Sequence, residues 1–449
     1  MKTKILLWSV VSLLIISLAV GAFWWLSRPQ VITFSDDAKV TLLAVQYGKH
    51  HAPPSVKMPA APAGRPPARA RGTFTTTNDT LVLWVRQEYD SSGNQYHNFQ
   101  YYAYDKAGTA CVQTYGRNYG GNNRQGNDVV AVQFDAFPRR EGKFYVRVQE
   151  SDNGGQEMSD QKFVVANPSP GSFTKWTAEP LPATKDDGDL TVTLTKLTVG
   201  ATLAITRNQD NPDDPANKGV QAVFHVERNG KPVTNWEPVS VETSDATGNQ
   251  LTVNRVGDNG WQNGWANYNW ANDEDTFAYQ FGLWPDEPAW KLKFEFSQNS
   301  DFADNELWTV SNLPLVPGRQ RDFNNVRNSR TNAVVAETDL NGFHLKILQA
   351  VQFTDVSPNN YQQGGVLIQI SPDLAEGVRL TLASLTDDQT NDITHSSYGT
   401  YRTGNTTTYR YALRDIAGIT NINLTLAVHK SRFVEFTAKP VLEAANDNN

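Results

Sequence analysis

Loops rich in carboxylates are the first residues here whose types suggest chemistry. Three stretches concentrate them: QDNPDDPANKG with Asp210, Asp213 and Asp214, ESDNGGQEMSD with Glu150, Asp152, Glu157 and Asp160, and NSDFADNE with Asp301, Asp304 and Glu306. Calcium prefers several oxygen ligands from one short loop, which these stretches offer only loosely. None has EF-hand spacing, and acidic loops also serve solubility alone. The sequence therefore leaves a calcium ion open at one acidic loop, and we assign no cofactor and no metal ligands.

Catalytic signatures are missing from the sequence. It contains no HExxH, GxSxG or P-loop motif. The histidines are scattered, and no third ligand accompanies the adjacent pair His50 and His51. Cys111 is the single cysteine, so an intrachain disulfide is impossible, and its setting predicts a buried strand residue. A hydrolase with paired carboxylates stays open, because sequence does not reveal the distance between two side chains. We lean against an enzyme.

Aromatic residues form the most distinctive candidate site. Three stretches rich in Gly, Asn and aromatic residues begin at Tyr115 (YGRNYGGNNRQGN), Trp261 (WQNGWANYNWAND) and Ser397 (SYGTYRTGN). Exposed aromatic faces beside polar groups can stack on sugar rings or anchor a protein partner. The candidate ligand-binding residues are Trp261, Trp265, Tyr268 and Trp270. In the alternative, these rings cover the end of their own domain or pack against a neighbouring one.

An internal repeat indicates which elements position these stretches. Residues 132–150 (VQFDAFPRREGKFYVRVQE) resemble residues 279–297 (YQFGLWPDEPAWKLKFEFS), and a fainter third copy spans 409–429. The apolar residues alternate with polar ones, which is typical of half-buried strands. We therefore predict strands at 39–47, 80–88, 98–104, 109–115, 128–135, 143–150, 161–166, 189–200, 219–228, 237–243, 249–255, 275–283, 290–297, 306–311, 342–352, 364–371, 377–385, 391–395, 406–413, 420–428 and 432–438.

About seven short strands per copy resemble an immunoglobulin-like or fibronectin type III-like sandwich. The predicted fold class is all-β, with three tandem immunoglobulin-like β-sandwiches after an N-terminal transmembrane helix. The sandwiches are expected at 31–168, 172–317 and 325–442, followed by a disordered tail at 443–449. The aromatic stretches then become loops at one end of each sandwich, beside other loops of that end.

A basic, proline-rich segment at 49–72 interrupts the first copy between its first two strands. It is read as a long inserted loop, and its cations are Lys49, Lys57, Arg65, Arg69 and Arg71. A solvated loop is one interpretation. The other is contact with an anionic surface such as lipid head groups or wall polymer.

The N-terminus predicts a membrane segment within residues 1–30. No charge interrupts residues 5–26, and a helix of that length spans roughly 33 Å, close to the hydrocarbon thickness of a bilayer. Trp24 and Trp25 sit where interfacial aromatic residues are found. We favour an uncleaved anchor that places the bulk of the chain outside the cytoplasm, in the cell envelope. A cleaved signal peptide near residues 1–22 is the alternative, and the protein would then be secreted.

The stretches FPRREGKFYVRV, WPDEPAWKLKFEFS and AVHKSRFVEF resemble an uncharacterised bacterial family of membrane-anchored β-rich proteins. The resemblance implies the architecture and no activity. A net charge of −7 gives no case for nucleic acid. The expected function is a noncatalytic, envelope-exposed binding or scaffold protein that contacts a protein partner or a glycan. The alternatives are a hydrolase of envelope or extracellular glycans and a membrane-anchored sensor or assembly subunit.

Overall fold

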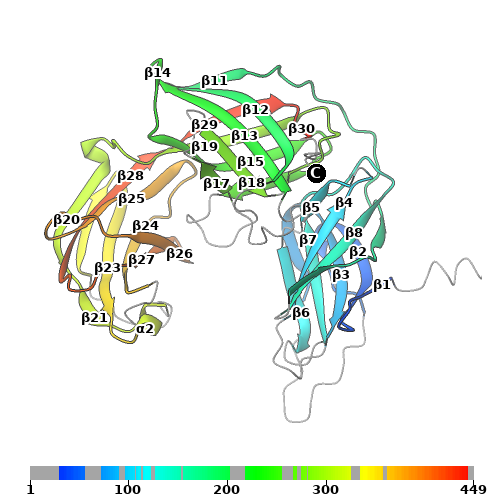
Figure 1. The fold of residues 1–449 in the computed structure, drawn as a ribbon, viewed down its shortest axis with the longest axis horizontal. Coiled ribbons are helices and arrows are strands. Elements are labelled where there is room, and N and C mark those ends of the chain that lie inside the picture. Colours follow the sequence, from blue (N-terminus) through cyan, green and yellow to red (C-terminus); the bar gives the residue numbers. More distant parts are fainter. Residues whose placement is uncertain are drawn as a thin grey trace, which may run out of the picture. The chain divides into compact units, whose positions relative to one another are not determined.

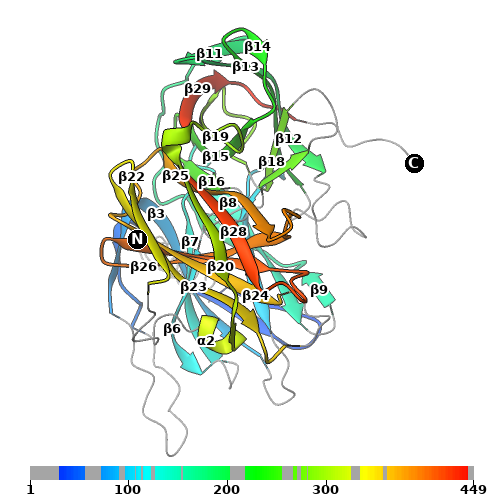
Figure 2. The ribbon, with the colours of Figure 1, turned by 90° about the vertical axis from the view of Figure 1, so that its left-hand side faces the viewer.

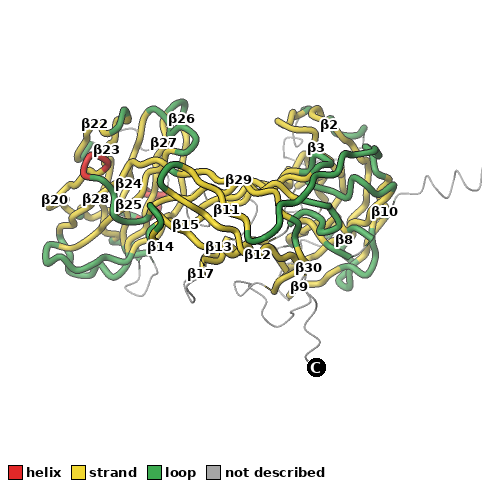
Figure 3. Tube along the Cα trace, turned by 90° about the horizontal axis from the view of Figure 1, so that it is seen from above, coloured by secondary structure: helices red, strands yellow, loops and turns green. Residues whose placement is uncertain are grey.

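The computed structural model shows an all-β protein, as predicted (Figures 1 and 3). It describes residues 30–55, 72–89, 97–106, 108–112, 115–122, 127–152, 155–202, 218–254, 266–269, 275–280, 282–324, 334–356 and 362–442. In these ranges the helical elements are the short η2 (Asp304–Glu306) and α2 (Gln320–Asn324). None of the described helices has the length and apolar character that crossing a membrane requires. The predicted anchor at 1–30 lies outside the described residues except for Gln30, and so does the tail at 443–449.

The chain divides into two compact units, residues 1–172 and 173–449. The first unit contains two sheets, ordered β1-β2-β3-β7-β6 and β10-β8-β4-β5, with β9 paired to β8. Their strands are β1 (Val31–Thr33), β2 (Lys39–His51), β3 (Phe74–Glu88), β4 (Asn98–Tyr104), β5 (Ala110–Val112), β6 (Tyr115–Asn122), β7 (Asn127–Phe134), β8 (Lys143–Asp152), β9 (Gly155–Met158) and β10 (Phe163–Ala166).

The second unit contains two further pairs of sheets. The second sandwich combines β11-β12-β13-β18-β17, with β14 on β13 and β30 on β12, and β16-β15-β19-β29. Its strands are β11 (Ala183–Asp187), β12 (Leu190–Thr202), β13 (Lys218–Arg228), β14 (Lys231–Pro232), β15 (Trp236–Asp245), β16 (Gln250–Asn254), β17 (Ala266–Asn269), β18 (Asp275–Gln280), β19 (Trp290–Gln298), β29 (Arg432–Ala438) and β30 (Val441–Leu442).

The third sandwich combines the sheets β20-β28-β25 and β21-β23-β24-β27-β26, with β22 on β23. Its strands are β20 (Leu307–Pro314), β21 (Val316–Gly318), β22 (Ala336–Leu340), β23 (Phe343–Phe353), β24 (Gly364–Ser371), β25 (Val378–Asp387), β26 (His395–Thr403), β27 (Thr406–Leu413) and β28 (Asn421–Lys430). One buried apolar cluster joins both sheets, including Leu313, Leu345, Ile368 and Leu426.

The internal repeat is visible in the strand order. Three runs of strands are equivalent: β2-β3-β7-β6, β12-β13-β18-β17 and β23-β24-β27-β26. The first strand of each run also pairs antiparallel with the strand that precedes it in the chain, which is β1, β11 or β22. The repeated motif supplies the cores: Phe134, Phe144 and Val146 are fully buried in the first copy, and Leu292, Phe294 and Phe296 in the second. The alternation in the sequence thus marks the inward face of β8 and β19.

The second and third sandwiches exchange their last strands. Residues 306–311 were expected to complete the second sandwich, but β20 pairs with β28 of the third. Residues 432–438 were expected to complete the third, but β29 pairs with β19 of the second. In Figure 1 the C-terminal β29 lies beside β19, and Figure 2 shows β20 running along β28.

Burial supports this pairing. Phe436 on β29 is fully buried, with its ring centroid 6.4 Å from those of Phe224 and Phe294 in the second sandwich. Only Ser431 separates β28 from β29, so the chain crosses from one sandwich to the other almost within a single strand. The strand exchange therefore makes the second and third sandwiches one interdependent unit.

The aromatic stretches are another departure from expectation. They contain strands rather than long loops: β6 pairs with β7, β17 with β18 and β26 with β27. Each of these strands stands last in the strand order of its sheet. It pairs there because the backbone N–H and C=O groups along the edge of β7, β18 or β27 require hydrogen-bond partners. The basic segment at 49–72 begins within a strand, because residues 49–51 belong to β2. Strands β2 and β3 stay paired out to His51 and Phe74.

Candidate functional site

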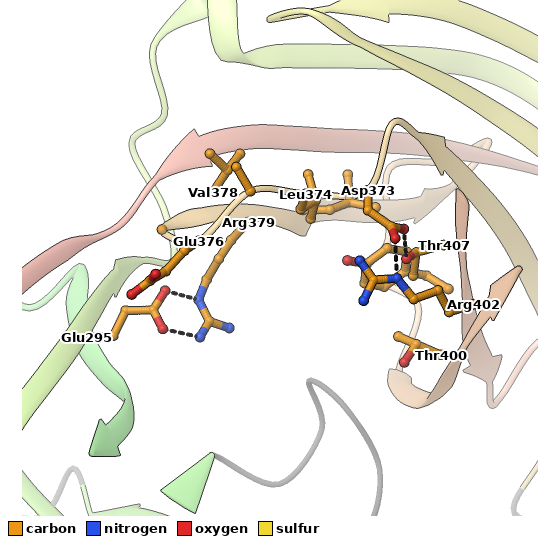
Figure 4. Close-up of a pocket in the computed structure, with 13 residues that line it drawn as sticks. Glu295, Asp373, Leu374, Glu376, Val378, Arg379, Thr400, Arg402 and Thr407 are labelled. Carbon is orange, nitrogen blue, oxygen red and sulfur yellow. Dashed lines mark hydrogen bonds and ion pairs between the residues drawn. The ribbon is translucent and has the colours of Figure 1, made fainter. Parts of the chain in front are cut away.

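A polar cleft of about 380 Å³ lies where the second and third sandwiches meet (Figure 4). The loop of residues 373–377, between β24 and β25, forms one wall, and β26 and β27 add Thr400, Arg402, Thr407 and Tyr409. The second sandwich contributes Glu295 of β19. The cleft therefore combines residues of both sandwiches, and Glu295 of β19 meets Arg379 of β25 in it.

The wall loop is anchored to the second sandwich. Lys293 of β19 lies 3.0 Å from Glu376 and stacks its ammonium 4.7 Å from the ring centre of Phe433 on β29. Gly377 has a φ of +74°, a conformation that favours glycine, and a Cβ there would lie 2.8 Å from the Phe433 ring. The backbone conformation and the packing against Phe433 thus both favour glycine at the point where the loop meets β29.

Glu295 and Arg379 form the first charged pair of the cleft. The guanidinium donates through Nε and Nη2 to the two carboxylate oxygens, both at 2.7 Å, and Ser240 Oγ donates at 2.9 Å. Burial opposes the ionisation of Glu295, but the hydrogen bonds and charge of Arg379 outweigh it and hold the pKa of this carboxyl below its usual value. Glu295 is therefore a fixed anion at neutral pH.

Asp373 and Arg402 form the second charged pair, at the opposite end of the cleft (Figure 4). Arg402 Nε and Thr407 Oγ1 both donate to the Asp373 carboxylate, and the side chain of Asp373 is almost buried. The side chain of Arg402 is 68% exposed. Asp373 thus orients a guanidinium that remains accessible to a ligand, and such a group suits planar oxygen-bearing partners.

His429 on β28 lies directly across from Arg379 in the strand ladder. Its Nε2 is 2.9 Å from Thr381 Oγ1, and its ring lies 4.8 Å from that of Phe302. Burial, aided by the charge of Arg379, lowers the pKa of His429 to about 4. The residue is therefore neutral at pH 7 and makes this junction sensitive to acid.

This arrangement suits recognition of a polar ligand. The cleft volume falls within the range of about 300–1,000 Å³ typical of small-ligand sites. Hydroxyls of Thr400, Thr407 and Tyr409 line it together with the two oriented ion pairs. Its charges are fixed in place and offer directional hydrogen bonds to a bound molecule.

The four aromatic candidates cannot be placed together. Tyr268 lies in strand β17, opposite Phe277 of β18, rather than in a loop. Trp261, Trp265 and Trp270 lie outside the described residues.

Of the five basic candidates, Lys49 is exposed near the end of β2. Lys57, Arg65, Arg69 and Arg71 lie outside the described residues. The basic segment therefore stays a prediction.

The acidic candidates are dispersed where they are described. Glu150 on β8 faces Glu157 on β9 in the strand ladder, but Glu157 accepts a hydrogen bond from the backbone of Ser35. Asp160, Asp301 and Asp304 are exposed, while Asp210, Asp213 and Asp214 lie outside the described residues.

The adjacent histidines point to opposite faces of β2. His50 is exposed and its Nδ1 lies 3.1 Å from Thr75 Oγ1. His51 is buried against Phe74, and burial lowers its pKa. Two side chains on opposite faces of a strand do not converge on one ion.

The cleft residues carried no signal that sequence reasoning could use. Glu295 and Arg379 belong to different copies of the repeat and stand 84 positions apart. The sequence predicts each copy of the repeat as a separate sandwich, and that prediction does not indicate a site shared between two of them. A scan of models of known protein families and a search of curated proteins both found no match for this chain.

Proposed function

We propose that this chain is a noncatalytic binding or scaffold protein of immunoglobulin-like modules, and that the cleft of the strand-exchanged unit is a contact site for a glycan or a protein segment. The observation that carries the proposal is the exposed guanidinium of Arg402, oriented by Asp373 in a ligand-sized polar cleft. Orientation before binding lowers the entropic cost of recognition.

The strand orders support the immunoglobulin-like part of the proposal. The sheet β2-β3-β7-β6 corresponds to the order A-B-E-D, and β10-β8-β4 to G-F-C, as in immunoglobulin domains. The proposal also places the modules in the cell envelope behind an N-terminal anchor, from the apolar run at residues 5–26.

The experiment measures binding of the full chain to a panel of neutral and acidic oligosaccharides, alongside release of reducing ends. We expect saturable binding without turnover, weakened at least about tenfold in Arg402→Ala. Lys346→Ala is the matched control, because this cation of the third sandwich lies outside the cleft. Turnover would instead establish a hydrolase, and equal binding by Arg402→Ala would remove the cleft from the proposal.

The aromatic stretch of the second copy is tested in the same assay. We expect Trp265→Ala or Trp270→Ala to weaken binding if these rings contact the ligand. Unchanged binding in both variants would restrict the contact to other residues.

A further inference from the structure

Three side chains of metal-ligating type converge in the first unit. Asp36, His97 and Glu150 each offer one ligand atom, and these atoms all lie within 4.8 Å of one another. Asp36 lies in the turn between β1 and β2, His97 directly precedes β4, and Glu150 lies on β8. Strand β4 pairs with β8 so that Glu150 faces Phe99, which brings His97 to the same end of that pair.

Both carboxylates meet the imidazole at the same nitrogen. His97 Nδ1 lies 2.6 Å from Glu150 Oε1 and 3.6 Å from Asp36 Oδ2. One Nδ1–H makes a good hydrogen bond to only one of these oxygens, whereas a cation between the three groups contacts both. The other ring nitrogen, Nε2, is buried and has no hydrogen-bond partner among the described residues.

The ligand groups are held in place before any ion arrives. The His97 side chain is 1% exposed and that of Glu150 is 5% exposed. The His97 ring lies 4.7 Å from the ring of Tyr89 and stacks 6.4 Å from that of Phe99. Such packing fixes the direction in which Nδ1 points.

The turn that carries Asp36 is fixed as well. Asp36 Oδ1 accepts a hydrogen bond from the backbone N–H of Ala38 at 3.0 Å, which leaves Oδ2 directed at His97. The neighbouring Ser35 donates through its hydroxyl and its backbone N–H to Glu157 of β9. The turn is thereby tied to the sheet that holds Glu150.

We propose that Asp36, His97 and Glu150 bind a divalent transition-metal ion of the Zn²⁺ or Mn²⁺ class. One imidazole nitrogen and two carboxylate oxygens suit these ions better than Ca²⁺, which prefers an all-oxygen shell. Bonds of about 2.1 Å place neighbouring ligand atoms roughly 3.0–3.4 Å apart. The separations of 2.6 and 3.6 Å from Nδ1 lie close to that range, and the two carboxylate oxygens, within 4.8 Å of each other, would approach to the same range around an ion. Asp36 is the most exposed ligand, which leaves its side of the ion open to water.

His344 provides the matched control. Its Nδ1 lies 2.8 Å from Asp339 and its Nε2 lies 3.4 Å from Glu337, so its carboxylates meet opposite ring nitrogens and do not converge. All three of these side chains are more exposed than His97 and Glu150. His344 thus also has two carboxylates as neighbours, but they do not meet at one ring nitrogen as they do at His97.

The experiment titrates the full chain, free of any histidine tag, with Zn²⁺ by calorimetry in two buffers of different ionisation enthalpy. We expect one site and release of up to one proton, because Nδ1 must be unprotonated to coordinate. Affinity should fall at least about 100-fold in His97→Ala and at least about tenfold in Asp36→Asn, and stay unchanged in His344→Ala and His50→Ala.

Asp36→Asn keeps the proposal testable if His97→Ala fails to fold, since Asp36 lies in a surface turn. Circular dichroism of each variant checks the fold. Absence of Zn²⁺ and Mn²⁺ binding by the native chain would overturn the proposal. Binding that survives in folded His97→Ala, or that is lost in His344→Ala or His50→Ala, would place the metal elsewhere and also overturn it.

Discussion

Arg379 of the third sandwich donates hydrogen bonds from Nε and Nη2 to the two carboxylate oxygens of Glu295 in the second sandwich, each at 2.7 Å. The side chains are only 18% and 11% exposed, so neither charge is well solvated by water. Removing one partner of such a pair leaves a charge that is largely buried and uncompensated. Loss of either partner should therefore destabilise the junction between the two sandwiches, because the remaining charge would be buried without a counter-ion.

Arg379→Ala should lower the free energy of unfolding of the second unit by about 2–4 kcal/mol. Arg379→Lys should recover part of this, because it restores the charge without the two-point geometry. Urea denaturation followed by tryptophan fluorescence measures both. The control is Arg319→Ala, whose pair with Asp322 is more than half exposed and should contribute less than about 1 kcal/mol. Equal effects of Arg379→Ala and Arg319→Ala would contradict the role of burial.

Acid should destabilise the second unit through His429. Its pKa is about 4 when folded and 6.5 when unfolded, so the unfolded state binds the proton first as the pH falls. Stability is complete above pH 6.5 and declines as the pH falls towards 4. The expected loss is about 1 kcal/mol at pH 5.5 and about 3 kcal/mol at pH 4.

His429→Gln should flatten this decline between pH 6.5 and 4, whatever its effect at pH 7. The control variant is His344→Gln, which replaces a half-buried histidine paired with Asp339 instead. Urea denaturation at several pH values provides the measurement. Glu295 adds a separate loss at lower pH: its folded pKa is lowered, so its stabilisation is present above the unfolded value of 4.5 and lost as the pH falls through the folded one. A decline that is identical in native chain and His429→Gln would assign the acid sensitivity to other groups.

The wall of the cleft should depend on Gly377. A side chain there meets both the positive φ and the ring of Phe433, so Gly377→Ala should distort the loop of residues 373–377 and weaken ligand binding by about tenfold or more. Gly404→Ala is the control: it also has a positive φ, but a Cβ there meets no atom within 4 Å. Binding that falls equally in both variants would mean that backbone strain alone, and not the shape of the cleft, is responsible.

The sequence predicts most strands correctly, because apolar and polar residues alternate along them. The predicted ranges 98–104, 364–371, 406–413 and 432–438 coincide with β4, β24, β27 and β29. Alternation shows that a segment is a half-buried strand, but it does not show which sheet receives it. For that reason β20 and β29 were recognised as strands and assigned to the wrong sandwiches.

The prediction that the aromatic stretches are loops was wrong for a different physical reason. Gly and Asn disfavour strands intrinsically, so the stretch at Tyr115 predicted a loop. Pairing with β7 overrides that preference, since the ladder satisfies the backbone of β6 along most of its length. The cleft and the Asp36, His97 and Glu150 cluster were missed because each joins residues far apart in the chain, and only the fold brings them together.

The strand exchange leads to the sharpest prediction, because it reverses what chain order implies. Deleting residues 431–449 removes β29 and the buried ring of Phe436 from the second sandwich, while the third keeps its complete set of strands with β20. Losing a whole core strand costs more than the ~3–5 kcal/mol typical of a single Phe→Ala change. Hydrogen–deuterium exchange should therefore show lost protection in β13, β15 and β19 and retained protection in β23, β24 and β28.

Deleting only residues 440–449 is the control for this truncation. It removes the short β30, whose Val441 and Leu442 are exposed, and leaves β29 in place, so protection of β19 should persist. Independent sandwiches in chain order would instead lose protection in the third sandwich when residues 431–449 are removed. That result would contradict the exchanged pairing of β29 with β19. It would also remove the basis of the cleft, which requires Glu295 of β19 to lie against Arg379 of β25.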